Sequence, residues 1–593
     1  MGIKNNTLSL RTHRLSSEQK QESRGENLAQ SLSRIAGVSM LANGASITKP
    51  VINGMHSNRI LVLNNGIRHE GQQWGNEHAP EIDAFIADKL TVIKGVDELK
   101  YGSDAIGGVI LVQPKPLRSH PGKSAEVNLG YFTNNRQYVA SAIFEHQPEK
   151  LAALSYRIQG TFKRGANVNT PNYRLNNTGS KEYNFSATAG WKKENFSTEL
   201  FYSQFNTLLG IFQGAHIGNL TDLQNAIEQE QPDPVYTGQN TYKINRPYQD
   251  ITHHIVKSKS QLIRNGHKFN LQVSGQFNNR KEYDIVRSTS VTTPQLNLSI
   301  STITQDLSWE HPTVKHFTGS VGLAGMQQDN AYAGRYFIPN YQAYSYGAYA
   351  IEKWSRDKWD IQAGIRFDHK RINTNRLLSG GSSFDEYHFR FNTVAGSVNT
   401  AYRFTNSWKA NISASLSGRA PQVNELLSNG IHHGTATYEE GNINLKAEQS
   451  LNLSGTLSYQ HPDKKLDAEF TVYRNGIRDF IYRQPVPSDP VLTIAGAFPL
   501  IRYRQTDAVL YGGDASVVIR PIDKLEWTSR GSVLRARNTT IKDWLILMPA
   551  DRVSTELVYK PGDYKKLDRM YVSAEVEHVF RQTRTPDERF GKQ

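Results

Sequence analysis

The 593-residue chain contains no cysteine. This absence excludes a disulfide framework, thiolate metal ligands and a cysteine nucleophile. The chain also lacks any run of about 18 apolar residues, so the sequence predicts no transmembrane helix. Its first residues, Met1 to Asn6, lack the apolar segment of a signal peptide. The mean hydropathy of −0.57 is low, but membrane strands bury only alternate residues and leave a weak hydropathy signal.

Acidic residues are fewer than basic ones: 55 Asp and Glu stand against 69 Lys and Arg, which gives a net charge of +14. The basic residues are scattered and form no long run or basic helix, so nucleic-acid binding is not indicated. A surface that faces anionic lipid or lipopolysaccharide fits this charge equally well. Signatures of catalysis are also missing, including the Gly-x-Ser-x-Gly elbow, His-Glu-x-x-His and a phosphate-binding loop. We therefore expect a protein that is not an enzyme.

The N-terminal part of the sequence predicts a small α+β unit. Residues 1–24 are polar and are expected to form a flexible lead-in. The spacing of apolar residues over 25–35 predicts a helix. From 60 to 112, short β-branched runs alternate with glycine turns, which indicates short strands. Within this stretch, 82–90 is predicted to be a short helix, and the loop before it is expected to expose a tryptophan.

From about residue 124 the apolar period changes to two. Phe269, Leu271 and Val273, for example, alternate with Asn270 and Gln272. Such strands place an apolar row on one face and a polar row on the other. About twenty segments follow this pattern, most of them about 9–14 residues long, the length that a tilted membrane strand needs. No internal repeat indicates a soluble propeller, and the pattern favours a membrane barrel over a sandwich.

The connections between these segments are unequal in length. Tight turns are predicted at 133–136, 264–266 and 462–464, and long loops at 206–249, 371–387, 418–445 and 486–498. Short turns at one end and long loops at the other are typical of outer-membrane barrels. In the longest loop, Leu220, Leu223 and Ile227 predict an amphipathic helix behind an Asn219 or Thr221 cap, which we expect to pack as a lid over the mouth.

Several motifs support a family resemblance. The N-terminal unit contains Arg59-Ile60-Leu61-Val62-Leu63-Asn64-Asn65-Gly66 and Tyr101-Gly102-Ser103-Asp104-Ala105-Ile106-Gly107-Gly108-Val109-Ile110. These segments resemble the plug domain of TonB-dependent outer-membrane receptors. Arg419-Ala420-Pro421-Gln422-Val423-Asn424-Glu425-Leu426 and the stretch from Tyr438 to Glu448 are similar to a late-barrel segment of the same family.

The resemblance implies a membrane all-β fold, in which a large antiparallel transmembrane β-barrel of about 22 strands encloses an N-terminal α+β plug. The domains expected are a lead-in at 1–24, a plug at 25–115 and a barrel at 120–593. Family members also have a signal peptide, a TonB-contacting box and a last strand that ends on an aromatic residue. None of these is identified here, so we expect the sequence to be truncated at both ends and to lack the last barrel strands.

Loops of the plug and barrel that face outward are the expected place for cargo. The candidate substrate-binding residues are Asn43, Gln72, Gln73, Trp74, His78, His216, His432 and His433. Among them His78, His432 and His433 are candidate metal ligands, since neutral imidazole suits borderline metals. The alternative is that Trp74 and His78 anchor their loop to the barrel wall, and that the His432-His433 pair forms structural hydrogen bonds. The pair His253-His254 is interpreted as structural.

Arg59 is the candidate contact between plug and barrel, together with inward charges such as Asp360 and Arg366. The resemblance implies an active-transport receptor of the Gram-negative outer membrane, monomeric and without a tightly bound cofactor, that takes energy from TonB. The expected cargo is a ferric siderophore or another metal chelate; haem, cobalamin and zinc stay open. The alternatives are a non-transporting binding, signalling or adhesion barrel and a soluble β-rich enzyme.

Overall fold

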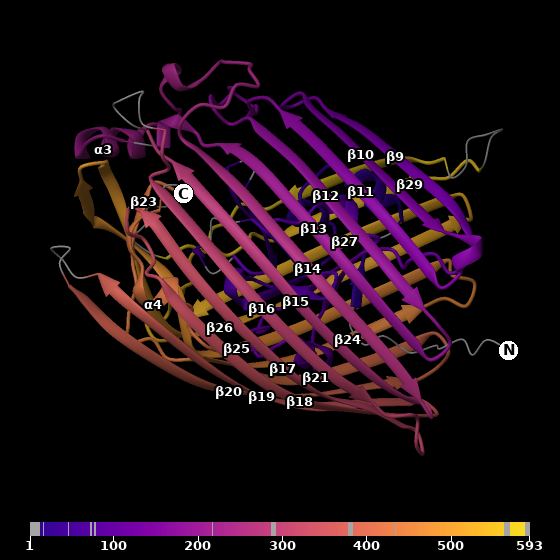
Figure 1. Cartoon of the computed structure of the whole chain (residues 1–593). Coiled ribbons are helices and arrows are strands. Elements are labelled where there is room, and N and C mark those ends of the chain that lie inside the picture. Colours follow the sequence, from indigo (N-terminus) through magenta and orange to yellow (C-terminus); the bar gives the residue numbers. More distant parts are fainter. Residues whose placement is uncertain are drawn as a thin grey trace.

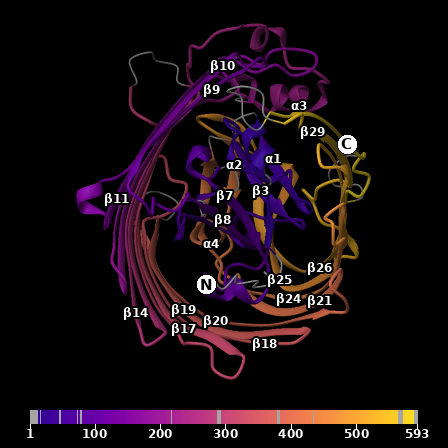
Figure 2. The same ribbon diagram turned by 90° about the vertical axis from the view of Figure 1, so that its right-hand side faces the viewer.

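A small N-terminal domain lies inside a large β-barrel (Figure 1). Viewed along the barrel, the N-terminal elements fill the lumen within the ring of strands (Figure 2). The computed structural model describes residues 12–15, 17–44, 47–71, 74–75, 79–215, 217–285, 292–377, 383–432, 435–562 and 570–586. In these residues no helix has the length and apolarity needed to cross a bilayer. The predicted fold class, a barrel with an α+β plug, is confirmed.

The plug is built on two small sheets. The five-stranded sheet has the order β1 (Thr12–Arg14), β7 (Lys89–Ile93), β8 (Gly108–Gln113), β5 (Ile60–Asn64) and β6 (Ile67–Arg68), and the three-stranded sheet consists of β2 (Val38–Asn43), β3 (Ile47–Ile52) and β4 (Met55–His56). Strands β5 and β8 pair in parallel, and all their other partners are antiparallel. Buried Leu, Ile and Val side chains from both sheets and from the helices form the plug core.

The helices of the plug are short. They are α1 (Ser17–Glu22) and α2 (Leu28–Leu32), with 3-10 turns at η1 (Ser57–Arg59), η3 (Ala84–Ile86) and η4 (Val96–Lys100). The helix predicted over 25–35 is present as α2, and Asn27 and Gln30 form its capping box. Within the predicted lead-in, the described residues form β1, which pairs with β7, and α1. The helix predicted at 82–90 is wrong, because pairing of β7 with β8 begins at Lys89 and leaves room only for η3.

The barrel sheet runs from β9 to β30 in the described residues. Its long strands are β9 (Gly122–Phe132), β10 (Gln137–Gln147), β11 (Leu154–Gly165), β12 (Ser180–Lys192), β13 (Phe196–Gly210), β14 (Tyr248–Arg264), β15 (His267–Tyr283), β16 (Leu296–Glu310), β17 (Phe317–Gly334), β18 (Tyr341–Arg356), β19 (Trp359–Leu377), β20 (Phe384–Arg403), β21 (Trp408–Arg419), β24 (Glu448–Gln460), β25 (Leu466–Thr493), β26 (Gly496–Ile522), β27 (Leu525–Asn538), β29 (Arg552–Tyr559) and β30 (Val572–Val579). The loops add α3 (Leu220–Glu228), α4 (Val423–Leu427), β22 (Asn429–His432), β23 (Thr437–Glu440), β28 (Asp543–Trp544), η5 (Glu149–Leu151), η6 (Gln213–Ala215) and η7 (Pro234–Tyr236).

The two faces of the barrel wall differ as the alternation predicts. On β15, Phe269, Leu271 and Val273 are exposed on the outer face, whereas Gln276 and Asn278 are buried against the plug. Near the ends joined by short turns, outward aromatic rings pair across strands. Such pairs include Trp359 with Tyr402 and Trp408 with Tyr459, with ring centroids 4.5 and 4.8 Å apart. An apolar belt edged by aromatic residues is the outer surface expected in lipid.

Short turns join the strands at one end of the barrel and the long loops lie at the other end, but some segments differ from the prediction. The tight turn at Asn265-Gly266 has φ angles of 51° and 81°, which suit Asn and Gly. Most of 371–387 and 486–498, predicted as loops, belongs to hairpins, because β19 pairs with β20 to Leu377 and β25 with β26 to Thr493. The tight turn at 133–136 lies at the long-loop end, where the Tyr242 hydroxyl donates to the Arg136 carbonyl oxygen.

Candidate functional site

Arg59 connects the plug directly to the barrel wall. It ends η1, and its carbonyl oxygen accepts a 2.8 Å hydrogen bond from the Gly107 backbone N–H. A Cβ at Gly107 would lie 2.5 Å from Met55 Cβ, so only glycine permits this approach. The buried guanidinium lies over the Phe480 ring, 4.0 Å from its centroid. From there Arg59 Nε donates to Glu448 Oε2 at 3.1 Å, and Nη2 donates to Glu448 Oε1.

Glu448 joins Arg59 to a second arginine of the barrel. Glu448 begins β24 and stands opposite Arg419, the last residue of β21. Arg419 Nε donates to Glu448 Oε2 at 2.8 Å, and its Nη1 and Nη2 donate to Glu425 at 2.8 and 3.1 Å. We call Arg59, Arg419, Glu425 and Glu448 the latch. Its four side chains are buried and their formal charges cancel, the condition under which a buried ion-pair network is tolerated.

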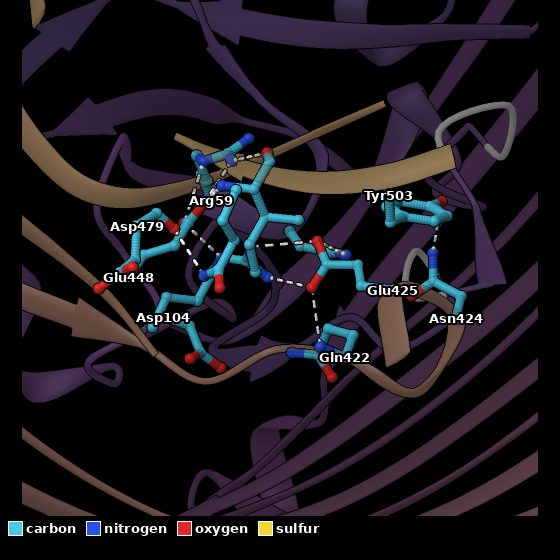
Figure 3. Close-up of polar contacts among 12 residues, drawn as sticks. Arg59, Asp104, Gln422, Asn424, Glu425, Glu448, Asp479 and Tyr503 are labelled. Carbon is cyan, nitrogen blue, oxygen red and sulfur yellow. Dashed lines mark hydrogen bonds and ion pairs between the residues drawn. The ribbon is translucent and has the colours of Figure 1, made fainter. Parts of the chain in front are cut away.

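The latch continues into the loop that follows β21. Glu425 lies on α4 and accepts a 2.8 Å hydrogen bond from the Gln422 backbone N–H (Figure 3). The next contacts lead outward from α4: Asn424 Nδ2 donates to the Tyr503 hydroxyl at 3.1 Å, and that hydroxyl donates to Glu439 Oε2 at 2.9 Å. A chain of hydrogen bonds therefore links the plug to the loop residues 420–447.

His432 belongs to this chain of contacts. Its Nδ1 lies 2.9 Å from Glu439 Oε1, and its ring centroid lies 4.8 Å from that of Phe337. The side chain is fully buried. This placement matches the structural alternative rather than an open metal ligand. His433, its neighbour in the predicted pair, lies outside the described residues.

Trp74 does not offer an exposed stacking surface, and that prediction is wrong. Its side chain is fully buried, and Nε1 donates to Asn330 Oδ1 at 2.7 Å. The ring belongs to an apolar cluster with Leu298, Phe337 and Leu426 of the barrel and its loops, so it anchors the plug loop to the wall. Asn43 is exposed at the end of β2. The candidates Gln72, Gln73, His78 and His216 lie outside the described residues.

A second polar cluster joins the plug loop around 69–81 to strands β14 and β15. Glu81 Oε2 lies 2.7 Å from His69 Nε2 and 4.0 Å from His253 Nδ1, while Arg280 Nη2 donates to Glu81 Oε1 at 2.6 Å. Burial alone would raise the pKa of Glu81, but His69 and Arg280 lower it to about 2. The loop passes close to the wall at Gly71 (φ 121°), where a Cβ would lie 2.6 Å from Asn278 Nδ2.

Elsewhere the interface between plug and barrel is polar and contains cavities. One cavity of about 550 Å³ is lined by Arg68 and Asp104 of the plug and by Asp306, Arg366 and Lys370 of the barrel, among others. Arg366 Nη1 donates to the Leu99 carbonyl oxygen at 3.0 Å, so it contacts the plug as expected. Asp360 instead accepts a 2.6 Å hydrogen bond from Ser355, within the barrel wall.

The longest loop extends over the barrel mouth. The backbone N–H of Ala497, at the start of β26, donates to the Ile217 carbonyl oxygen at 3.1 Å, so this loop crosses from β13 toward β26. The predicted amphipathic helix is present as α3, and Asn219 Oδ1 accepts from the Asp222 N–H as its cap. Leu223 is buried, whereas Leu220 and Ile227 are exposed, so only part of the predicted apolar face packs.

Comparison with known protein families identifies the family to which this chain belongs. A model described as TonB dependent receptor-like, beta-barrel matches residues 114–587, and one described as TonB-dependent Receptor Plug Domain matches residues 4–109. The chain belongs to the TonB-dependent receptor family. Barrels of this family are proteins of the Gram-negative outer membrane, and the suspected resemblance is confirmed. The latch therefore connects the plug of a TonB-dependent receptor to its barrel.

Relatives of this TonB-dependent receptor have several cargoes. The vitamin B12 transporter BtuB of Vibrio cholerae is 27% identical over 125 residues, which are 21% of this chain. The matched part spans 20% of that relative's length. The solved structure of the copper transporter OprC has a TM-score of 0.77 at 17% identity, covering 97% of this chain and 87% of OprC. The siderophore receptor PirA of Acinetobacter baumannii has a TM-score of 0.69 at 15% identity, covering 94% and 84%.

Several site residues of this receptor were missed in the sequence. Arg419, Glu425 and Glu448 lie inside the two late-barrel segments that carried the resemblance, but a linear motif does not show which charges meet. His69 and His253 are 184 positions apart and were not connected, and His253 was interpreted as structural. Only the barrel closing around the plug brings these residues together.

Proposed function

We propose that this chain is an active-transport receptor that binds a scarce nutrient at its long-loop end and releases it into the periplasm with energy transmitted by TonB. The observation that carries the proposal is the latch, a buried set of charges that joins the plug to the barrel. Family members and structural neighbours are transport receptors, not enzymes. The apolar outer belt supports a place in the outer membrane, where the positive chain faces lipopolysaccharide.

A polar latch suits a plug that must stay in place at rest and move during transport. Breaking an apolar core exposes hydrocarbon to water, which costs about 25 cal/mol per Å². Charged groups, by contrast, exchange their partners for water once water enters, and cavities already lie along this interface. In the closed state the paired charges stabilise a single position of the plug. A mechanical force applied to the plug from the periplasm then has to break only these ion pairs and hydrogen bonds.

For the cargo we propose a metal chelate, with a ferric siderophore first. Support comes from the neighbours, which are named as siderophore, iron and copper transporters, and from the BtuB relatives. Haem, cobalamin and zinc are the alternatives within this class. The exposed Asn43 of the plug and the loops at 211–247 and 420–447 lie at the end where such a cargo would enter.

Growth of a deletion strain tests the proposal. The strain, complemented with the wild-type gene or an empty vector, is grown under separate limitation for iron, zinc and cobalamin. A transporter restores growth under one limitation only, and that limitation identifies the cargo class. Equal growth with and without the gene under all three would contradict import of these nutrients. Cargo binding without any growth effect would point to a signalling or adhesion barrel.

Arg59→Ala separates binding from transport once the cargo class is known. The change removes the plug side of the latch and leaves the outward loops intact. We expect uptake to fall at least tenfold, while binding of labelled cargo to whole cells changes less than about twofold. Arg24→Ala, which removes an exposed contact to Glu126, is the matched control, since exposed ion pairs contribute only about 0–1 kcal/mol. Wild-type transport by a well-expressed Arg59→Ala receptor would exclude a role for the latch.

A further inference from the structure

Three potential metal ligands meet between plug and barrel without being part of the latch. They are His69 and Glu81 from the plug and His253 from β14, and one nitrogen or oxygen of each lies within 4.8 Å of the others. Their side chains are 0%, 3% and 1% exposed. Two imidazoles and a carboxylate are a known ligand set for zinc. The hydrogen bonds around the cluster determine which imidazole nitrogen of each histidine carries the lone pair, and so whether that lone pair can face the other ligands.

The protonation state of His253 follows from Gln276. The Gln276 side chain donates from Nε2 to the Arg68 carbonyl oxygen at 2.8 Å, and its Oε1 accepts from the Glu70 N–H at 3.0 Å. The same Oε1 lies 3.2 Å from His253 Nε2, so this nitrogen carries the proton and donates. The lone pair of neutral His253 is therefore on Nδ1, which is buried without a hydrogen-bond partner and lies 4.0 Å from Glu81 Oε2.

His69 Nε2 and Glu81 Oε2 lie close enough to share either a proton or a cation. The Nε2 atom lies 3.2 Å from the Glu81 backbone nitrogen and 2.7 Å from Glu81 Oε2. One imidazole nitrogen cannot accept a hydrogen bond from the first and donate one to the second, because it carries either a lone pair or a proton. The shorter contact identifies Nε2 as the donor to Glu81 Oε2, which leaves the lone pair of neutral His69 on Nδ1, a buried atom without a hydrogen-bond partner. A cation between Nε2 and Oε2 takes the place of this proton, since metal binding to imidazole releases a proton.

The remaining contacts orient the carboxylate. Arg280 Nη2 donates to Glu81 Oε1 at 2.6 Å, and Asn278 Nδ2 donates to Oε2 at 3.2 Å. Gln276 holds His253 in the same way, through the nitrogen that faces away from Glu81. Ligand residues held by such outer hydrogen bonds are the usual surroundings of a protein metal site.

We propose that His69 Nε2, Glu81 Oε2 and His253 Nδ1 bind one divalent transition-metal cation of the zinc class. Bonds of about 2.0–2.2 Å to nitrogen and oxygen need side-chain shifts, because the ligand atoms now lie 2.7 Å (His69–Glu81) and 4.0 Å (His253–Glu81) apart and all within 4.8 Å of one another. The ion joins two plug residues to one barrel strand, so it cross-links the loop around 69–81 to the wall. Because the cluster is enclosed by protein, the ion is resident and distinct from the transported cargo.

Zinc binding by the purified full-length receptor tests this site without any transport assay. Receptor stripped with a chelator is dialysed against Zn²⁺, and the bound metal is measured by elemental analysis. We expect wild type to retain one more tightly bound ion per chain than His253→Gln, whose affinity falls at least about 100-fold. His254→Gln is the matched control, since His254 lies next on the same strand and bonds Tyr202 on the other face; it retains the ion.

A spectroscopic measurement keeps the test decisive if a variant does not fold. X-ray absorption at the zinc edge of the loaded wild-type receptor should show two imidazoles and an oxygen ligand in the first shell. Equal zinc retention by wild type and His253→Gln, or a zinc spectrum without imidazole, would overturn the site and leave a hydrogen-bond network only. Neither result bears on nutrient uptake, so failure of this site and failure of the proposed function are distinguishable.

Discussion

Glu448 is the residue on which the latch converges. Its two oxygens accept from Arg59, Arg419 and the Ile481 backbone N–H. Glu448→Gln keeps the shape but leaves two buried guanidinium groups with one carboxylate fewer, and unpairing a buried charge costs about 3–5 kcal/mol. We expect a lower midpoint of thermal unfolding and faster protease cleavage of the plug. Glu310→Gln, which breaks an exposed pair with Lys268, should change stability by less than about 1 kcal/mol.

His56 gives the plug a dependence on pH. Burial, with Arg59 and Lys49 nearby, lowers the pKa of His56 to about 3. The unfolded chain binds this proton below about pH 6.5 while the folded plug does not, so stability is full above pH 6.5 and falls as the pH drops toward 3. At pH 5 the loss from this group is about 2 kcal/mol.

Thermal unfolding at pH 7.5 and pH 5 measures this effect. His56→Gln cannot bind the proton, so we expect a smaller drop in the unfolding midpoint between the two pH values than in wild type. His461→Gln, in the tight turn after β24, controls for the loss of an imidazole. An equal drop in wild type and His56→Gln would show that other groups set the acid sensitivity.

The contacts and burial of single residues were harder to predict from the sequence than the elements or the fold. Arg59 could be singled out from the sequence because it precedes a recognisable strand and turn. Its partner Glu448 lies 389 positions away, and nothing local in the sequence marks it. Trp74 was misinterpreted for a related reason: it stands among polar loop residues, and the apolar cluster that buries it comes from distant barrel strands.

At the scale of elements, α4 depends on a close backbone approach from Gly441. The Gly441 N–H donates to the Ser428 carbonyl oxygen at 2.8 Å, and a Cβ there would lie 2.6 Å from the Leu426 carbonyl carbon and the Leu427 nitrogen. Gly441→Ala must therefore displace the helix that carries Glu425. We expect a loss of about 1–3 kcal/mol in stability, with a matching loss of cargo uptake.

A loop glycine with free space around it provides the comparison for this element. At Gly218 an added Cβ meets nothing within 4 Å, so Gly218→Ala should leave the unfolding midpoint within about 1 °C of wild type. Equal stability of both variants would mean that α4 adjusts without cost and does not position Glu425 rigidly.

Elements with a strong period were predicted well, and those set by pairing were not. The two-residue alternation identified the barrel strands because one face meets lipid and the other meets the plug. Hairpins that continue beyond the membrane, such as β25 with β26, lose that contrast and were interpreted as loops. The 82–90 segment has helical apolar spacing, but its last residues pair with β8, and tertiary pairing outweighs local preference.

At the scale of the whole molecule, the inward face of the barrel is polar and forms hydrogen bonds to the plug. Inward residues of β14, β15 and β19 bond to plug backbone or side chains, as Lys257 does to the Asn65 carbonyl oxygen and Gln362 to Asp97. The same inward faces would be stable in contact with water, since they carry amides, hydroxyls and charges. The barrel wall therefore does not depend on the plug for its stability, in the way that one layer of an apolar core depends on the layer packed against it.

Deletion of residues 1–113 tests this independence. The strands from β9 onward keep their hydrogen-bonded ladder and apolar belt, so we expect the shortened barrel to assemble in detergent and to form an open pore in lipid vesicles. Vesicles with this variant should swell in small sugars at least tenfold faster than vesicles with wild type, whose lumen is filled. Arg59→Ala, which retains the plug, is the control and should stay near the wild-type rate. A plug-free barrel as impermeable as wild type would show that the loop carrying α3, which crosses the mouth, seals the lumen without the plug.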